Sequence, residues 1–209
     1  MPLLFSDYIY KELAADTLKP SEIEKAARLK TRAGFSNELI DFCEKRLINT
    51  MNCRFCAVKT DIAYGTEAGI IDIGFGEFYS RSLYENLYGC KKAFIFAVTI
   101  GLEVDRLLAR LYISSPSEHF ITDALASAYA EAACNSANEV LAKGCNLKRR
   151  FSPGYGDFPL ELQPHILKSV NAEKYLNITL SKALMMTPKK SITAIAGIDL
   201  SEGEKSSDI

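Results

Sequence analysis

An apolar run from Ala93 to Ile100 (AFIFAVTI) constrains the fold of this chain more than any other segment. Two lysines precede the run and Gly101 follows it. A short apolar stretch between such boundaries is typical of a β-strand that is buried inside a protein. The sequence therefore predicts a sheet that contains a buried strand at this position.

Two helices are expected directly after this strand, at about residues 102–112 and 118–142. The second helix is crowded with alanine and serine side chains, which allow another backbone to approach closely. We therefore expect it to pack under the sheet. Three acidic residues on it, Asp123, Glu131 and Glu139, exclude a membrane span.

A helical part is predicted at about residues 20–52. Ser21 and Glu24 form a capping-box pattern, and Gly34 is placed to end that helix. Ser36 can cap a second helix, whose apolar residues fall on one face: Leu39, Ile40, Cys43, Leu47 and Met51. Beyond it, residues 53–62 and 69–73 are expected to be extended, and a short helix is expected between Ser80 or Ser82 and Gly89.

The remaining chain combines loops with short regular elements. Residues 143–164 form a long irregular stretch with aromatic residues, which is typical of an ordered functional loop. A short helix from Pro164, strands near 177–180 and at 191–198, and a turn at 185–190 follow. Helices and strands in this irregular order predict an α+β fold for residues 1–198 as a single domain, with a mobile polar tail at 199–209.

Composition limits the classes of function. The chain has 209 residues, 48% hydrophobic and 24% charged, as in ordinary globular proteins. Its formal net charge of -1 argues against a nucleic-acid binder, and no apolar run approaches the roughly 20 residues of a membrane span. Six cysteines without a secretory signal favour reduced thiols and a cytoplasmic location.

Three residue patterns that could form chemical sites are better explained by structural roles. Gly74-Phe75-Gly76 after an apolar strand resembles the glycine turn of nucleotide-binding methyltransferases, but the third glycine of that pattern is missing, which favours a plain turn. The Cys53–Cys56 pair lacks the two further ligands of a structural zinc site. His119 and His165 have no serine or cysteine partner at the spacing of a hydrolytic triad.

The segment from Lys148 to Pro159 (KRRFSPGYGDFP) leaves two interpretations open. Three cations precede a turn that contains proline, glycine and aromatic residues. One interpretation is a basic cluster on a surface loop. The other is an anion clamp, in which an arginine grips a carboxylate through two parallel hydrogen bonds and a tyrosine closes over the ligand.

The same segment resembles the activation domain of cobalamin-dependent methionine synthase. Residues 150–159 (RFSPGYGDFP) are similar to the family's R-x-x-x-G-Y-x-x-x-P signature. Residues 178–181 (ITLS) and 185–194 (MMTPKKSITA) look like its L-T-x-S, M-x-P and S-V-S segments in the same order. Residues 99–101 and the helix at 123–134 resemble a short, free-standing branch of the family. The resemblance covers about residues 15–198 and is most specific from Arg150 onward.

This resemblance implies an α+β domain with a bent antiparallel sheet that binds S-adenosylmethionine. Arg150 would hold the methionine carboxylate, with Ser152, Gly154 and Tyr155 forming the rest of the loop site. The family's helix carboxylate, which meets the ligand's amino group, falls at Ser127, and Glu131 lies one turn later. Gly156 replaces a proline, and a C-terminal tyrosine of the family's site has no counterpart. The resemblance implies no catalytic side chain and no metal ligand.

The implied function is the reactivation of a corrinoid methyltransferase. One electron and a methyl group from S-adenosylmethionine would convert cob(II)alamin on the partner to methylcobalamin. The partner would be a methionine synthase without its own activation domain or another corrinoid protein. A flavodoxin or ferredoxin would supply the electron, and Lys148, Arg149, Lys189 and Lys190 are candidates to meet it.

Two other functions stay open. The chain would be a non-catalytic sensor or binding module if it had kept the fold without the ligand. It would be a conventional S-adenosylmethionine methyltransferase if Gly74 and Gly76 formed the ligand site. Whether the chain is an enzyme is therefore undecided, and any activity would be methyl transfer together with a corrinoid partner.

Overall fold

The apolar run at residues 93–100 forms the central strand of an antiparallel sheet. The computed structural model describes residues 6–21 and 35–199. Its main sheet has the strand order β1-β2-β6-β10-β7, in which β6 (Lys92–Thr99) lies between β2 (Cys53–Asp61) and β10 (Ser191–Asp199). Residues 93–99 of β6 are all buried, as expected. The edge strands are β1 (Ser6–Leu13) and β7 (Asn146–Leu147).

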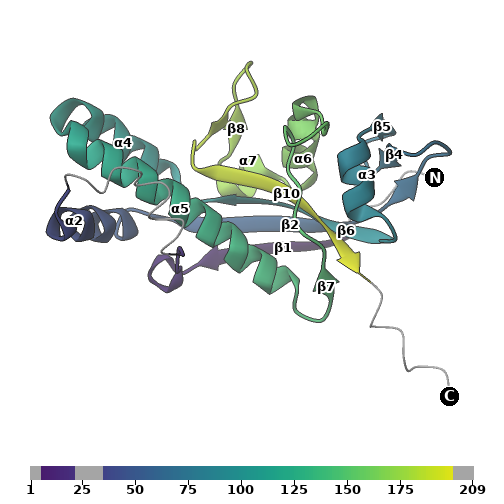
Figure 1. Cartoon of the computed structure of the whole chain (residues 1–209), viewed down its shortest axis with the longest axis horizontal. Helices are drawn as coiled ribbons and strands as arrows, with labels where there is room; N and C mark the ends of the chain where they lie inside the picture. The colour runs from purple at the N-terminus through teal and green to yellow at the C-terminus, as the bar shows by residue number, and fades with distance from the viewer. Residues whose placement is uncertain (1–5, 22–34, 200–209) are drawn as a thin grey trace.

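The long small-residue helix α5 (Pro116–Leu141) covers one face of this sheet. It contacts β2, β6 and β10, and its alanines are buried there with Phe55, Phe96 and Val98. Helices α2 (Asn37–Ile48) and α4 (Leu102–Ser114) pack against α5, beside its N-terminal half (Figure 1). The predicted packing of this helix under the sheet is confirmed.

Three short helices cover the other face. They are α3 (Arg81–Leu87), α6 (Gln163–Ser169) and α7 (Ala172–Leu176), and their apolar residues pack with Cys56, Val58 and Ile95. Two small sheets accompany them, one formed by β3 (Ala63–Tyr64), β4 (Ile70–Asp72) and β5 (Phe78–Tyr79), the other by β8 (Thr179–Leu180) and β9 (Met186–Thr187). Two 3-10 turns, η1 (Ala15–Thr17) and η2 (Leu160–Leu162), complete the described elements.

Local sequence signals place the helix starts correctly. The Ser36 hydroxyl accepts a hydrogen bond from the Leu39 amide at 3.3 Å, and the Ser80 hydroxyl accepts one from the Leu83 amide at 3.2 Å. Both are N-caps, which satisfy amides that the first helical turn leaves unpaired. The helix predicted to open at Ser21 lies mainly outside the described residues.

Several short or edge elements were not predicted. Strands β1 and β7 have no expected counterpart, because they pair with β2 and β10, which are far away in the sequence. The two-residue strand β9 and the short helix α7 have no expected counterpart either. The segment predicted as a turn at 185–190 contains β9, which pairs with β8. Strand β10 extends to Asp199, where the polar tail was expected to begin, and the rest of that tail lies outside the described residues.

The two cysteines of the C-x-x-C motif lie on opposite faces of the sheet. Cys53 packs in the core under α5, and Cys56 packs in the core under α3 and α6. Side chains three residues apart on a strand point in opposite directions, so these thiols cannot bind one metal ion together. Burial raises the pKa of both Cys53 and Cys56 to about 12, so both are neutral thiols at pH 7.

The glycines after β4 form a turn that Asp72 closes. Its Oδ1 accepts hydrogen bonds from the amides of Gly74 at 2.7 Å and of Phe75 and Gly76 at 3.1 Å. This carboxylate occupies the amides that a nucleotide phosphate or carboxylate would need. The plain-turn interpretation is therefore the one that the geometry supports. Among the described helices, none combines the length and apolar character that crossing a membrane requires.

Candidate functional site

The segment after β7 runs along the open edge of β10. The Lys148 amide donates to the Gly197 carbonyl at 2.8 Å, and Phe151 and Ile195 exchange two backbone hydrogen bonds of 2.8 Å. These bonds extend the sheet by a few residues and fix the register of the loop. Because side chains alternate along extended backbone, this register decides which loop residues face α5 and which face α3.

Arg150 points from this segment to α5. Its Nη2 donates to Glu131 Oε2 at 2.9 Å, and its Nη1 donates to Asn135 Oδ1 at 2.6 Å. Glu131 and Asn135 are one helical turn apart, so their side chains are neighbours on the helix surface. The guanidinium is therefore held against α5 by two acceptors rather than left in solvent.

A tight turn follows Arg150 and returns the chain to the core. The Gly154 amide donates to the Phe158 carbonyl at 2.8 Å, and the Tyr155 amide donates to the Ser152 carbonyl at 3.2 Å. The ring of Phe158 is buried under α3, whereas 67% of Tyr155 is exposed. The buried phenylalanine anchors the turn, and the tyrosine ring remains free to contact a bound molecule.

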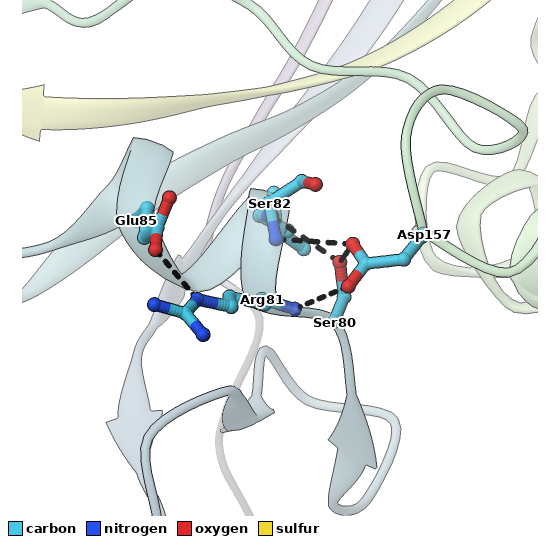
Figure 2. Close-up of polar contacts among 6 residues, drawn as sticks. Ser80, Arg81, Ser82, Glu85 and Asp157 are labelled. Atoms are coloured by element: carbon cyan, nitrogen blue, oxygen red, sulfur yellow. Dashed lines mark hydrogen bonds and ion pairs between the residues drawn. The ribbon is translucent and has the colours of Figure 1, made fainter.

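Asp157 fastens the turn to the N-terminus of α3. Its carboxylate accepts hydrogen bonds from the Ser80 hydroxyl at 2.9 Å, the Arg81 amide at 2.8 Å and the Ser82 amide at 3.0 Å (Figure 2). Desolvation acts to raise the pKa of Asp157, but hydrogen bonds from Ser82, Ser80 and Arg81 outweigh it and lower the pKa to about 2. The carboxylate is thus ionised at neutral pH and caps the helix.

Gly156 allows the close contact that this clamp requires. A Cβ atom at Gly156 would lie 2.6 Å from the Ser82 hydroxyl, and its φ of +56° is one that proline cannot adopt. Gly156, at the position of the family's proline, therefore allows the loop to pack closely on α3.

A cavity of about 820 Å³ opens between α5, this loop, α6 and β10, a volume within the range of small-molecule sites. Four of the six residues predicted to bind the ligand line it: Arg150, Ser152, Tyr155 and Glu131. Gly154 does not line the cavity and instead shapes the turn with a φ of +85°.

Ser127 is also absent from the cavity wall, because Lys190 occupies its hydroxyl. Lys190 Nζ donates to Ser127 Oγ at 2.8 Å and forms an ion pair of 2.8 Å with Asp123. The Ser127 hydroxyl donates in turn to the Asp123 carbonyl at 3.1 Å. Glu131, one turn later, does line the cavity, as does Asn138 farther along the same helix.

Part of the cavity wall is apolar. Leu160, Leu184, Met186 and Ile192 line the cavity together with Tyr155. Gln163 is fixed in the same wall, because its Nε2 donates to Thr193 Oγ1 at 2.8 Å and to the Met186 sulfur at 3.2 Å. A flat, weakly polar group fits such walls better than a charged one.

Several wall residues were not identified from the sequence. Gln163, Asn86 and Asn138 are polar residues inside helices, and nothing in their local pattern distinguishes them from solvent-facing positions. Met186 and Ser191 belong to the segments that carried the family resemblance, so a signal for them was present.

The described residues near the cavity offer no activated thiol. Burial raises the pKa of Cys134 to about 12, which outweighs the opposite effect of the nearby Arg150. His165 lies against Phe75 and His119 against Tyr112, and neither histidine lines the cavity. Neither this thiol nor these histidines therefore supply a nucleophile or a general base at the cavity.

Comparison with solved structures reveals a close structural counterpart. A crystal structure of the MetH reactivation domain bound to AdoHcy superposes with a TM-score of 0.69, over 97% of this chain and 80% of that chain, at 15% sequence identity. This chain has the MetH reactivation domain fold. No protein-family model and no curated protein matches the sequence.

The reactivation domain fold confirms the predicted α+β class and its curled antiparallel sheet. At 15% identity, the similarity to the reactivation domain extends to the path of the backbone and does not assign ligand contacts. The roles of individual cavity residues in this chain rest on its own geometry.

Proposed function

We propose that this chain binds S-adenosylmethionine in the cavity and supports reductive methylation of cob(II)alamin on a partner corrinoid methyltransferase. The observation that carries the proposal is Arg150, an arginine held by α5 on the wall of a cavity that apolar side chains also line. The fold agrees, since the similar MetH reactivation domain was crystallised with AdoHcy.

The shape of the cavity suits the two halves of this ligand. The guanidinium of Arg150 would bind the methionine carboxylate through paired hydrogen bonds, in exchange for one or both of its contacts on α5. The adenosine would lie toward Leu160, Met186 and Ile192, with the exposed ring of Tyr155 over it. The Ser152 backbone lies at the start of the same turn and would assist.

The chemistry requires little from the protein. One electron reduces cob(II)alamin on the partner to cob(I)alamin, which would then attack the methyl carbon of S-adenosylmethionine. The S–CH₃ bond would break as the Co–CH₃ bond forms, and S-adenosylhomocysteine would leave. The cobalt is the nucleophile and the sulfonium carries its own leaving group, so no general base is needed. The protein contributes positioning, which agrees with the neutral thiol of Cys134 near Arg150.

The partner would be a methionine synthase without its own activation domain or another corrinoid protein, and a flavodoxin or ferredoxin would supply the electron. Of the four cations considered for that contact, Arg149 and Lys189 are exposed. Lys190 forms an ion pair with Asp123, and the Lys148 ammonium donates a hydrogen bond to the Tyr88 carbonyl. We therefore assign the electrostatic contact to Arg149 and Lys189.

Calorimetric titration with S-adenosylmethionine tests the first part of this function. We expect saturable binding at one site per chain. Methylation of a cob(II)alamin-loaded partner by S-adenosylmethionine and a one-electron reductant tests the second. If the titration showed no binding and the assay showed no methylation, the sensor or binding module that has lost the ligand would be favoured.

The conventional methyltransferase has less support. Its site would be at Gly74 and Gly76, whose amides are occupied by Asp72, and neither glycine lines the cavity. Methylation of a substrate in the absence of any corrinoid would be needed to support the conventional methyltransferase.

A further inference from the structure

Leu184 has a backbone conformation that is unusual for its residue type. Its φ is +57°, which is in the left-handed region. The three other non-glycine residues with a positive φ in the described part of the chain are aspartate or asparagine: Asp7, Asn171 and Asn177. Those residue types tolerate this region because their short polar side chains can bond to the nearby backbone. Leucine has no such compensation, so the backbone is strained at this position.

The strain arises in the hairpin of β8 and β9, which projects from the main sheet (Figure 1). The Ser181 amide donates to the Met185 carbonyl at 3.0 Å, and the Leu184 amide donates to the Ser181 carbonyl at 3.0 Å. These bonds close a three-residue loop, in which the residue before the second strand is commonly left-handed and is usually glycine. Glycine would adopt this conformation without strain, so the hairpin itself does not require a leucine.

The side chain of Leu184 lines the cavity and does not pack in a hydrophobic core. Its hairpin neighbours Leu180 and Met186 pack against the core under α3, α6 and α7. Leu184 is partly buried, but it belongs to neither of the two cores that the described residues form. Core packing therefore does not offset the strain. Since backbone strain is concentrated at functional sites, a strained residue on a cavity wall indicates a role in binding.

We propose that Leu184 is a specificity-determining residue that packs against the nucleoside of the ligand. An aliphatic side chain favours a weakly polar group, and the adenosine is that group in S-adenosylmethionine, whereas the methionine carboxylate binds Arg150. Met186, two residues later in the same wall, accepts a hydrogen bond from Gln163, which fixes the hairpin beside Leu184. This assignment rests on the proposed function, because it takes S-adenosylmethionine as the ligand.

The first test measures affinity and stability on the full chain. Leu184→Gly and Leu184→Asn both introduce a residue that tolerates the left-handed region and remove the aliphatic side chain. Both variants should bind S-adenosylhomocysteine about fivefold more weakly, because the apolar contact is lost. Both should melt at the parent's temperature or above it, since the strain is relieved. Loss of affinity without loss of stability distinguishes a binding role from a structural one.

The matched control is Met185→Ala, which removes the adjacent apolar side chain of the same turn. Met185 is 61% exposed and does not line the cavity. This variant should bind S-adenosylhomocysteine as tightly as the parent does. An equal loss of affinity in Met185→Ala and Leu184→Gly would mean that the hairpin acts as a whole, and the specific role of Leu184 would be refuted.

The second test identifies the part of the ligand that Leu184 contacts. In protein with isotopically labelled leucine methyl groups, the methyl resonances of Leu184 are those that vanish in Leu184→Gly. With S-adenosylhomocysteine bound to the parent, we expect nuclear Overhauser effects between these methyl protons and the purine or ribose protons of the ligand. Contacts to the homocysteine protons alone would place Leu184 against the other half of the ligand and overturn the assignment.

The remaining outcomes separate this assignment from the proposed function. If the parent binds the ligand and both Leu184 variants bind it equally well, Leu184 is not part of the site and the proposed function stands. If the variants bind weakly but also melt at a lower temperature than the parent, Leu184 is a structural residue. A parent that does not bind S-adenosylhomocysteine would refute the proposed function together with this assignment.

Discussion

Arg150 and Glu131 form an ion pair of 2.9 Å on the cavity wall, although 19 positions separate them in the sequence. The side chains are 27% and 31% exposed, so the pair is accessible to a ligand without being fully solvated. A carboxylate that approaches Arg150 competes with Glu131 and Asn135 for the same guanidinium. Until the ligand binds, Glu131 and Asn135 hold the Arg150 guanidinium in the orientation in which the ligand carboxylate would meet it.

Arg150→Ala should weaken S-adenosylmethionine binding by about tenfold or more. A charge-assisted hydrogen bond contributes about 1.5–3 kcal/mol, and about 1.4 kcal/mol corresponds to a factor of ten. Arg150→Lys should recover only part of this loss, because an ammonium cannot form the paired contact. Calorimetry on variants that melt at the parent's temperature measures the effect.

The matched comparison for this experiment is Arg149→Ala, which removes the adjacent cation; Arg149 also lines the cavity but is exposed. It should leave ligand affinity nearly unchanged and slow association with an acidic electron donor at low salt. Equal losses of affinity at Arg149 and Arg150 would mean that the ligand carboxylate does not distinguish the two arginines.

The isolated chain should not turn over S-adenosylmethionine. Burial keeps the thiol of Cys134, near Arg150, neutral by raising its pKa to about 12, and the described cavity wall contains no histidine. Incubation with S-adenosylmethionine and chromatographic detection of S-adenosylhomocysteine should give no product above the uncatalysed rate. Steady product formation without corrinoid or reductant would contradict the proposed mechanism.

Purified protein should carry no stoichiometric zinc. Cys53 and Cys56 point to opposite faces of the sheet and are buried, so they cannot share a metal ion. Elemental analysis by mass spectrometry should find far less than one zinc per chain. About one zinc per chain, lost in Cys53→Ser, would require a different arrangement of β2.

Asp157→Asn should destabilise the protein by about 1 kcal/mol at pH 7, the usual magnitude for loss of a helix cap, with solvent exposure limiting the effect. The folded pKa of about 2 is below the unfolded value of about 4. The carboxylate therefore stabilises the fold above about pH 4, and this contribution is lost as the pH falls to about 2. Urea unfolding at pH 7 and at low pH measures it.

The variant should show a smaller loss of stability between pH 4 and pH 2 than the parent does, because it lacks this titrating group. Glu85→Gln, which removes an exposed partner of Arg81 on the same helix, serves as the control and should cost less. Parallel acid profiles for Asp157→Asn and the parent would show that Asp157 is not the titrating cap.

The family resemblance singled out the loop that lines the cavity but could not fix the partners of that loop. Ser127 and Glu131 are one turn apart on the same helix, and both fitted the expected position of the helix residue. Their roles separate in the fold because Lys190 follows the turn before β10 and occupies Ser127. The register of Phe151 against Ile195 then presents Arg150 to Glu131.

Short-range features of the sequence determined the elements themselves. The apolar run at 93–100 forms a buried strand, Ser36 and Ser80 cap helices, and the small residues of α5 allow close packing, because each signal acts within a few residues. Tertiary structure alone decided the pairing of β1 with β2 and of β7 with β10, and the docking of Asp157 on Ser80, which is 77 positions away. These contacts join segments whose local patterns carry no information about each other, so only the packing of the whole sheet and its helices brings them together.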